Sequence, residues 1–283
     1  MGSAVECILL AFALADRVNL RKQEKDEKQS QYMRELREQV TQRTEELTTA
    51  VEKLKTASIT DPLTGLSNRR HVDSAIQPWI AELQRARIRN SPGVPRRYLA
   101  LCLADLDRFK VINDELGHGV GDKVLQAAAE TLRQNVRATA ILSRWGGEEF
   151  LVLDHVTGPQ EDLLMAERLR RSILDECQPI FLEIGRSVSL SLGVVRYPFS
   201  AAIPELLSWD NCLALADHAL YRSKREGRNC WRCYRPNEHA LRRAVQELGM
   251  EEVRRLLRVH NEQAFEMGLI EVVEQVTSDV QVS

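Results

Sequence analysis

The sequence has no large net charge, and its apolar N-terminal stretch is too short to cross a membrane. Lysine and arginine total 39 against 41 aspartates and glutamates, a net charge of −2. No global field therefore attracts nucleic acid or an anionic membrane surface, and we expect no nucleic-acid partner. Residues 4–15 are apolar except for Glu6. This stretch is shorter than the roughly 20 residues that cross a bilayer, and it lacks the basic start of a signal peptide.

A disulfide framework is also missing. The six cysteines are scattered and mostly lie in apolar runs: Cys7, Cys102, Cys177, Cys212, Cys230 and Cys233. This usage predicts a reducing compartment, the cytoplasm. Cys230 and Cys233 form a CxxC in a strand-like run with no second pair, so neither a zinc site nor a redox site is expected.

Two interpretations of residues 4–15 stay open. The stretch is either a short buried helix or the end of a membrane helix whose earlier part lies upstream, giving a membrane tether. Arg17, Arg21 and Lys22 follow it and suit the cytoplasmic flank of such a helix.

Residues 18–58 contain no proline or glycine and are rich in charged side chains. One stripe recurs at alternating spacings of three and four, and its members are Met33, Leu36, Val40, Arg43, Leu47, Ala50, Leu54 and Ala57. A helix packed on its own domain would also show a stripe. Because this one is narrow and the other faces are charged, it favours a parallel two-stranded coiled coil. We therefore expect residues 1–57 to form an N-terminal signalling segment that makes a homodimer through residues 33–57.

Strand-like and helix-like segments interleave after Asp61-Pro62. Helical periods cover 68–87, 121–136, 161–176 and 206–225, and strand-like runs cover 98–104, 187–195 and 229–234. Because the central runs are apolar throughout, we expect an α/β (α+β) domain at 58–235 with a mostly antiparallel sheet flanked by helices. Residues 236–283 are predicted to be an appended element of two or three helices.

A Gly146-Gly147 pair separates two apolar runs and predicts a tight hairpin, because glycine accepts the positive φ of such turns. Glu148 and Glu149 follow directly. They are either a solvent-exposed acidic turn or, beside bare backbone that a ligand can approach, part of a site for a cation and a phosphorylated ligand.

A second pair of carboxylates, Asp105 and Asp107, ends the run 98–104. At i and i+2 on a strand they point the same way, so with the hairpin they offer up to four carboxylates. Hard oxygen ligands suit Mg²⁺ or Mn²⁺, and two such ions can hold a triphosphate and activate a hydroxyl. A turn or helix cap is the alternative for an isolated Asp-x-Asp.

The surroundings favour a nucleotide. Residues 108–110 add a cation and backbone N–H groups, and Lys224 and Arg228 add two more cations. Asn113 and Asp122 supply the acceptor and donor groups that read the edge of guanine.

These stretches together resemble the GGDEF family of diguanylate cyclases, with Gly146-Gly147-Glu148-Glu149-Phe150 as the signature. Four further stretches match in order: residues 61–70 (DPLTGLSNRR), 105–110 with Asn113-Asp114, 117–118 with 121–122, and 219–221 with Lys224 and 227–229. Five ordered motifs are a far more specific signal than any one of them.

The resemblance implies a palm-like fold and the condensation of two GTP molecules into cyclic di-GMP with release of pyrophosphate. Each domain would hold one GTP, so two domains must meet, in agreement with the predicted coiled coil. The ligands implied for Mg²⁺ or Mn²⁺, with two ions per site, are Asp105, the carbonyl of Leu106, Glu148 and Glu149. The substrate contacts implied are Phe109, Lys110, Asn113, His118, Asp122, Gly146, Gly147, Lys224 and Arg228. Glu148 or a metal-bound hydroxide would deprotonate the 3′-hydroxyl, with Glu149 and Lys110 also catalytic.

One position departs from the family pattern. An Arg-x-x-Asp product-inhibition motif precedes the hairpin in many members, and here the positions read Arg137-Ala138-Thr139-Ala140. The aspartate is replaced, which predicts weak or absent feedback inhibition at this site.

Two alternatives to the active enzyme are a catalytically silent module that binds GTP or cyclic di-GMP, and a coiled-coil adaptor. No signature carboxylate or glycine is lost, which disfavours the silent module, and the retained phosphate-side lysines disfavour the adaptor. Residues 14–20 and the following helix also resemble the exit from seven-transmembrane DISM-type sensors, which implies a place at the cytoplasmic face of the inner membrane.

Overall fold

The computed structural model describes residues 17, 22, 33–34, 36–49, 59–88, 97–158, 160–258 and 262–274. The chain divides into two compact units, Met1–Ala57 and Ser58–Ser283. The second contains the whole sheet, and its described residues include parts of the C-terminal extension.

The first unit is helical at residues 36–49. Within this single chain, the seam residues Met33, Leu36, Val40 and Leu47 are exposed. Arg43, the interruption of the seam, pairs with Glu46 at 2.9 Å. Ala50, Leu54, Ala57 and the apolar stretch 4–15 lie outside the described residues. Among those that are described, no helix combines the length and hydropathy needed to cross a membrane.

The second unit is built on a seven-stranded sheet with the order β1-β3-β4-β2-β5-β6-β7. The strands are β1 Ser67–Asn68, β2 Tyr98–Leu106, β3 Ile141–Gly146, β4 Glu149–Val156, β5 Leu190–Tyr197, β6 Trp231–Pro236 and β7 Ile270–Glu274. Among the strands that the structure describes, the pairs β1–β3 and β5–β6 are parallel and the other four pairs are antiparallel. The sheet is therefore mostly antiparallel.

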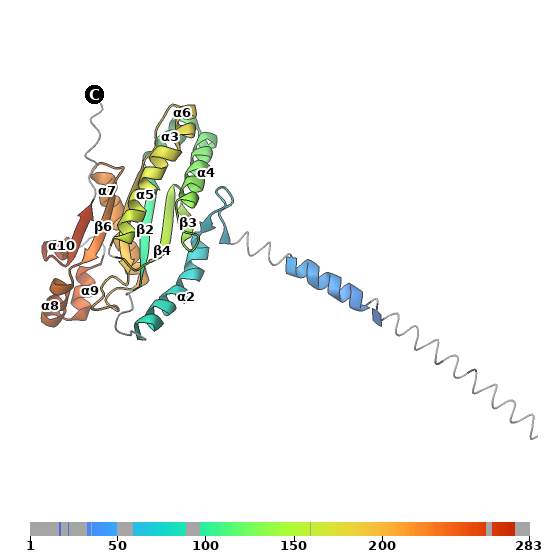
Figure 1. Cartoon of the computed structure of the whole chain (residues 1–283), viewed down its shortest axis with the longest axis horizontal. Helices are drawn as coiled ribbons and strands as arrows, with labels where there is room; N and C mark the ends of the chain where they lie inside the picture. Colours follow the sequence, from blue (N-terminus) through green and yellow to red (C-terminus); the bar gives the residue numbers. More distant parts are fainter. Residues whose placement is uncertain are drawn as a thin grey trace, which may run out of the picture. The chain divides into compact units, whose positions relative to one another are not determined.

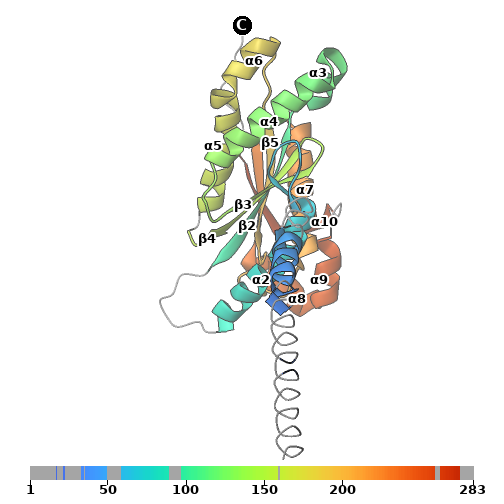
Figure 2. The same cartoon turned by 90° about the vertical axis from the view of Figure 1, so that its right-hand side faces the viewer.

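Helices cover both faces of the sheet (Figures 1 and 2), because the central strands are apolar on both sides. On β2, Ala100, Cys102 and Ala104 face one core, and Leu99, Leu101 and Leu103 face the other. The first core is closed by α3 Phe109–Leu116, α4 His118–Gln134, α5 Glu161–Glu176 and α6 Gln178–Ile184. The second is closed by α2 Arg69–Ile88, α7 Trp209–Arg225, α8 Glu238–Leu248, α9 Met250–Leu256 and α10 Gln263–Glu266.

The sequence predicted a wholly helical C-terminal extension, but the structure shows that the extension also contains a strand. After α8, α9 and the short α10 it returns to the sheet as β7, which pairs antiparallel with β6. Five residues with two adjacent valines show no clear period, so this edge strand was missed. Leu241, Val253 and Ile270 bury the extension against the second core.

Helix α7 crosses β5 at Gly193, and no side chain fits between them. A Cβ on Gly193 would lie 2.0 Å from the carbonyl oxygen of Ala216 and 2.4 Å from the amide nitrogen of Leu220. Glycine within a strand permits such a close approach of two backbones. This contact fixes how far α7 stands from the sheet.

We expect Gly193→Ala to lower the free energy of unfolding by about 2 kcal/mol or more, because the added methyl must push α7 away from β5. Denaturant unfolding measures the loss. Gly119→Ala is the control, since a Cβ there has no neighbour within 4 Å and the φ is not positive. Equal stability of the two variants would contradict the close packing of α7.

Candidate active site

The strand register brings the two carboxylate motifs together. Asp105, near the end of β2, lies opposite Glu149, the first residue of β4. The amide of Leu106 donates to the carbonyl of Glu148 at 3.3 Å. Directly opposed residues of an antiparallel pair have neighbouring side chains on the same face. The acidic hairpin and the end of β2 therefore form one site.

Lys224, in the last turn of α7, supplies a positive charge to this site. Its ammonium lies 2.7 Å from Oδ2 of Asp105, which is only 4% exposed. Burial and the nearby Glu148 and Glu149 raise the pKa of Asp105 to about 6, although Lys224 opposes the shift. Burial also raises the pKa of Glu149. One lysine thus leaves the acidic cluster with unbalanced negative charge.

Asp107 does not join the cluster as a free fourth carboxylate. It accepts hydrogen bonds from Oγ of Ser189 at 2.6 Å, from Oγ of Ser191 at 2.7 Å and from the amide of Asn229 at 3.0 Å. β2 ends at Leu106, and Arg108 turns the chain with a φ of 59°. The expected set of up to four carboxylates is therefore reduced to three.

The remaining donors suit a hard divalent cation by their chemistry. Asp105, Glu148 and Glu149 are oxygen ligands, and added positive charge would oppose both causes that raise the pKa of Asp105, its burial and its repulsion by the two glutamates. Within the described ranges, no three His, Cys, Asp or Glu side chains form a ready metal cluster. The carboxyl group of Asp105 is instead paired with Lys224.

The hairpin tip is braced from the segment before β1. Arg144 donates from Nε to the carbonyl of Gly147 at 2.8 Å and pairs with Asp61 at 3.1 Å. Burial alone would raise the pKa of Asp61, but hydrogen bonds from Thr64 and Arg144 lower it. Arg69 stacks over the ring of Trp145 at 4.6 Å. The predicted turn is correct, with Gly147 at a φ of 50°, but this bracing was not foreseen.

The expected base-reading residues gather where α3 meets α4. A Cβ on Gly121 would lie 1.9 Å from Oδ1 of Asn113, so the Asn113 amide lies directly over the start of α4. Asp122 is the next residue of α4, and His118 is its first; both are exposed.

The other expected substrate contacts differ in exposure. The Phe109 side chain is buried in the first core, so only its backbone is left to face a ligand. Lys110 and Arg228 are exposed. Arg228 follows α7 with a φ of 62°.

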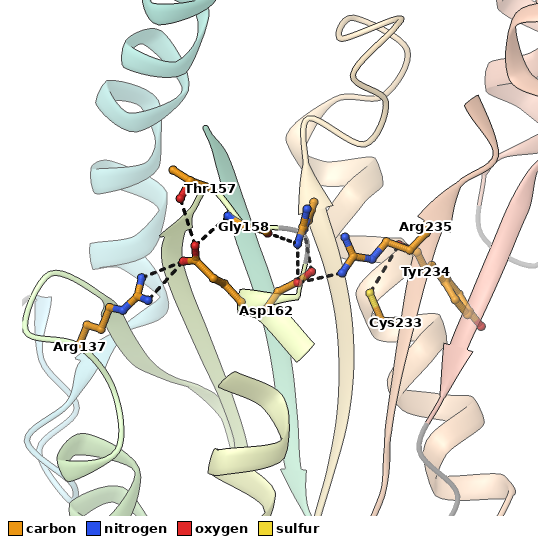
Figure 3. Close-up of polar contacts among 9 residues, drawn as sticks. Arg137, Thr157, Gly158, Asp162, Cys233, Tyr234 and Arg235 are labelled. Atoms are coloured by element: carbon orange, nitrogen blue, oxygen red, sulfur yellow. Dashed lines mark hydrogen bonds and ion pairs between the residues drawn. The ribbon is translucent and has the colours of Figure 1, made fainter. Parts of the chain in front are cut away.

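Arg137 forms its ion pairs at the beginning of α5, close to Thr157 and Gly158 (Figure 3). It pairs with Asp154 at 3.4 Å and with Glu161 at 3.3 Å. Glu161 is itself held by the amide of Gly158 at 2.7 Å. The next residue, Asp162, is fully buried and forms ion pairs with Arg196 and Arg235.

Comparison with known families bears on this site directly. Residues 58–230 match the model described as "Diguanylate cyclase, GGDEF domain", and this span contains the acidic hairpin, Asp105 and Lys224. The chain belongs to the GGDEF family.

The GGDEF domain also resembles individual proteins. The chain is 36% identical over 175 residues to the response regulator PleD of Caulobacter vibrioides, covering 61% of this chain and 35% of that protein. It is 35% identical over 179 residues to the diguanylate cyclase DgcP of Pseudomonas aeruginosa, covering 63% and 24%. The chain thus spans only about a third or less of the length of these relatives.

A solved structure shares the fold of the GGDEF chain. The coiled coil and GGDEF domain of DgcB from Caulobacter crescentus, in complex with c-di-GMP, aligns with a TM-score of 0.55 at 24% identity. The alignment covers 67% of this chain and 92% of that one. The predicted α/β fold with a mostly antiparallel sheet is confirmed.

Proposed function

We propose that the chain is a diguanylate cyclase that condenses two GTP molecules into cyclic di-GMP and releases pyrophosphate. The observation that carries the proposal is the register that sets Asp105 opposite Glu149, with Lys224 beside them. Membership of the GGDEF family and similarity to a named diguanylate cyclase support it.

The carboxylates of Asp105, Glu148 and Glu149, with the carbonyl of Leu106, would hold Mg²⁺ or Mn²⁺. A divalent cation bound there supplies positive charge to the phosphates and favours ionisation of the attacking hydroxyl. Glu148 accepts the proton of the 3′-hydroxyl. The 3′-oxygen of one GTP then attacks the α-phosphorus of the other as the bond to pyrophosphate breaks, and the reciprocal step closes the ring.

The other residues bind and orient the nucleotide. Lys110, Lys224 and Arg228 neutralise the phosphates and the charge that develops on the leaving pyrophosphate. Asn113 and Asp122 read the edge of guanine, and His118 contacts the guanosine. The backbones of Gly146, Gly147 and Phe109 lie close to the phosphates.

We infer that the active form is a homodimer held through residues 33–57. One domain binds one GTP, so the reaction needs a second domain facing it. The exposed Met33, Leu36, Val40 and Leu47 support this inference, because an apolar seam on a charged helix is stabilised by pairing.

The dimer incubated with GTP and Mg²⁺ is expected to form cyclic di-GMP, measured by chromatography together with released pyrophosphate. Glu148→Ala combined with Glu149→Ala should abolish turnover, because Asp105 and the carbonyl of Leu106 would be too few ligands to hold the cation. The melting temperature of this variant should not fall, since both side chains add negative charge to a crowded site.

No product from a confirmed dimer would contradict the enzyme. Bound GTP or cyclic di-GMP without turnover would then indicate the silent signalling module. Global unfolding of the double variant would show that the two glutamates are structural.

We also infer that product does not inhibit through Arg137, which pairs with Asp154 and Glu161 and has Ala140 where the motif has aspartate. Added cyclic di-GMP is expected to leave the initial rate unchanged at low micromolar levels. Noncompetitive inhibition at such levels, lost in Arg137→Ala, would overturn this inference.

A further inference from the structure

The turn that follows α7 has an unfavourable backbone. Gly227, Arg228 and Asn229 have φ values of 133°, 62° and 48° in succession. Glycine adopts such values freely and asparagine tolerates them, but a long side chain such as that of Arg228 rarely does. A strained backbone conformation of this kind persists only where the surrounding structure holds it in place. Such residues are found most often at active sites and ligand-binding sites.

Two buried side chains hold this turn by Asn229. The carboxylate of Asp107 accepts the backbone amide of Asn229 at 3.0 Å. Nη1 of Arg170 on α5 donates to Oδ1 of Asn229 at 2.8 Å. Asp107 and Arg170 are 5% and 6% exposed, so water competes little for either bond.

Both holding residues are themselves fixed. Ser189 and Ser191 donate to Asp107 at 2.6 and 2.7 Å. Glu167 binds Arg170 through both carboxylate oxygens, at 2.9 and 3.0 Å, and accepts from Nε1 of Trp231. Burial would raise the pKa of Glu167, but hydrogen bonds from Arg170 and Arg171 lower it to about 2. Glu167 therefore stays ionised at neutral pH and keeps its ion pair with Arg170.

Asp107 and Arg170, which we call the clamp because both bond Asn229, lie directly beside the acidic cluster. Asp107 is two residues beyond Asp105, which pairs with Lys224 at 2.7 Å. Lys224 is in the last turn of α7, and the turn that carries Arg228 begins three residues later. The end of β2 therefore holds the end of α7 at two points, by Lys224 and by Asn229.

We propose that Asp107 and Arg170 are positioning residues that act through Asn229 to aim Arg228 at the triphosphate of GTP. The proposal rests on the proposed function and adds two residues to it that touch no ligand. A cation fixed before the substrate arrives loses less conformational freedom on binding, so it contributes more to affinity.

The test is calorimetric binding of a GTP analogue with a methylene group between the α- and β-phosphates, in the presence of Mg²⁺. Arg170→Met and Asn229→Gly each remove the bond to Oδ1, and glycine keeps the positive φ. We expect each to weaken binding of the analogue by about tenfold, the order of one lost coupling. Binding of GMP, which lacks the β- and γ-phosphates, should change less than twofold.

Arg168→Met is the matched control, because Arg168 is also on α5 but bonds the carbonyl of Asn135 instead. It should bind like the wild type. In an Arg228→Ala background, Arg170→Met should cause no further loss, because the two changes act on one contact. Asp107→Asn should retain part of the affinity that Asp107→Ala loses, since an amide oxygen can still accept from Asn229.

Equal loss for the analogue and GMP, or additive losses in the Arg228→Ala background, would show a general structural role and overturn the proposal. A wild-type chain that binds neither nucleotide would instead refute the proposed function, and the positioning role with it.

Discussion

The concentration of carboxylates at the end of β2 is the constraint on which the site depends. Asp105 is buried opposite Glu149 and has Lys224 as its ion-pair partner. Holding like charges together in a low-dielectric setting is unfavourable, and it is tolerated because the sheet register leaves them no other place. The same excess of negative charge makes the site suited to a divalent cation and its phosphates.

The rest of the domain places positively charged side chains around the end of β2. Gly193 lets α7 lie directly on β5, which brings Lys224 to Asp105. The Asp107 and Arg170 clamp fixes the turn that follows. On the other side, Arg144 ties the hairpin tip to Asp61. Function thus comes from a rigid scaffold that fixes loops of opposite charge around one strand end.

Much of this could be predicted because its signals are local. The apolar run before Asp105 and the Gly146-Gly147 turn predicted the strand and the hairpin, and an antiparallel pairing then brings Asp105 to Glu149. Helix α3 was missed because its eight residues are fewer than the roughly 11 over which a helical period can be recognised in a sequence. The partners of Asp107 were missed because Ser189 and Asn229 lie 82 and 122 residues further along the chain. Gly193 was a signal that could have been used, since glycine inside a strand often marks a close backbone contact.

The free energy of unfolding of the wild type and of Asp105→Asn, compared from about pH 4.5 to 8, tests the buried-charge account most directly. Because the folded pKa of Asp105 is raised to about 6, the wild type loses stability as Asp105 ionises between its unfolded pKa and pH 6. The unfolding free energy of the asparagine variant should therefore rise relative to that of the wild type by about 2 kcal/mol between pH 4.5 and pH 6, at 1.4 kcal/mol per pKa unit, and the difference should then stay constant up to pH 8. A difference that does not change with pH, or a variant less stable than the wild type at pH 7, would contradict the account.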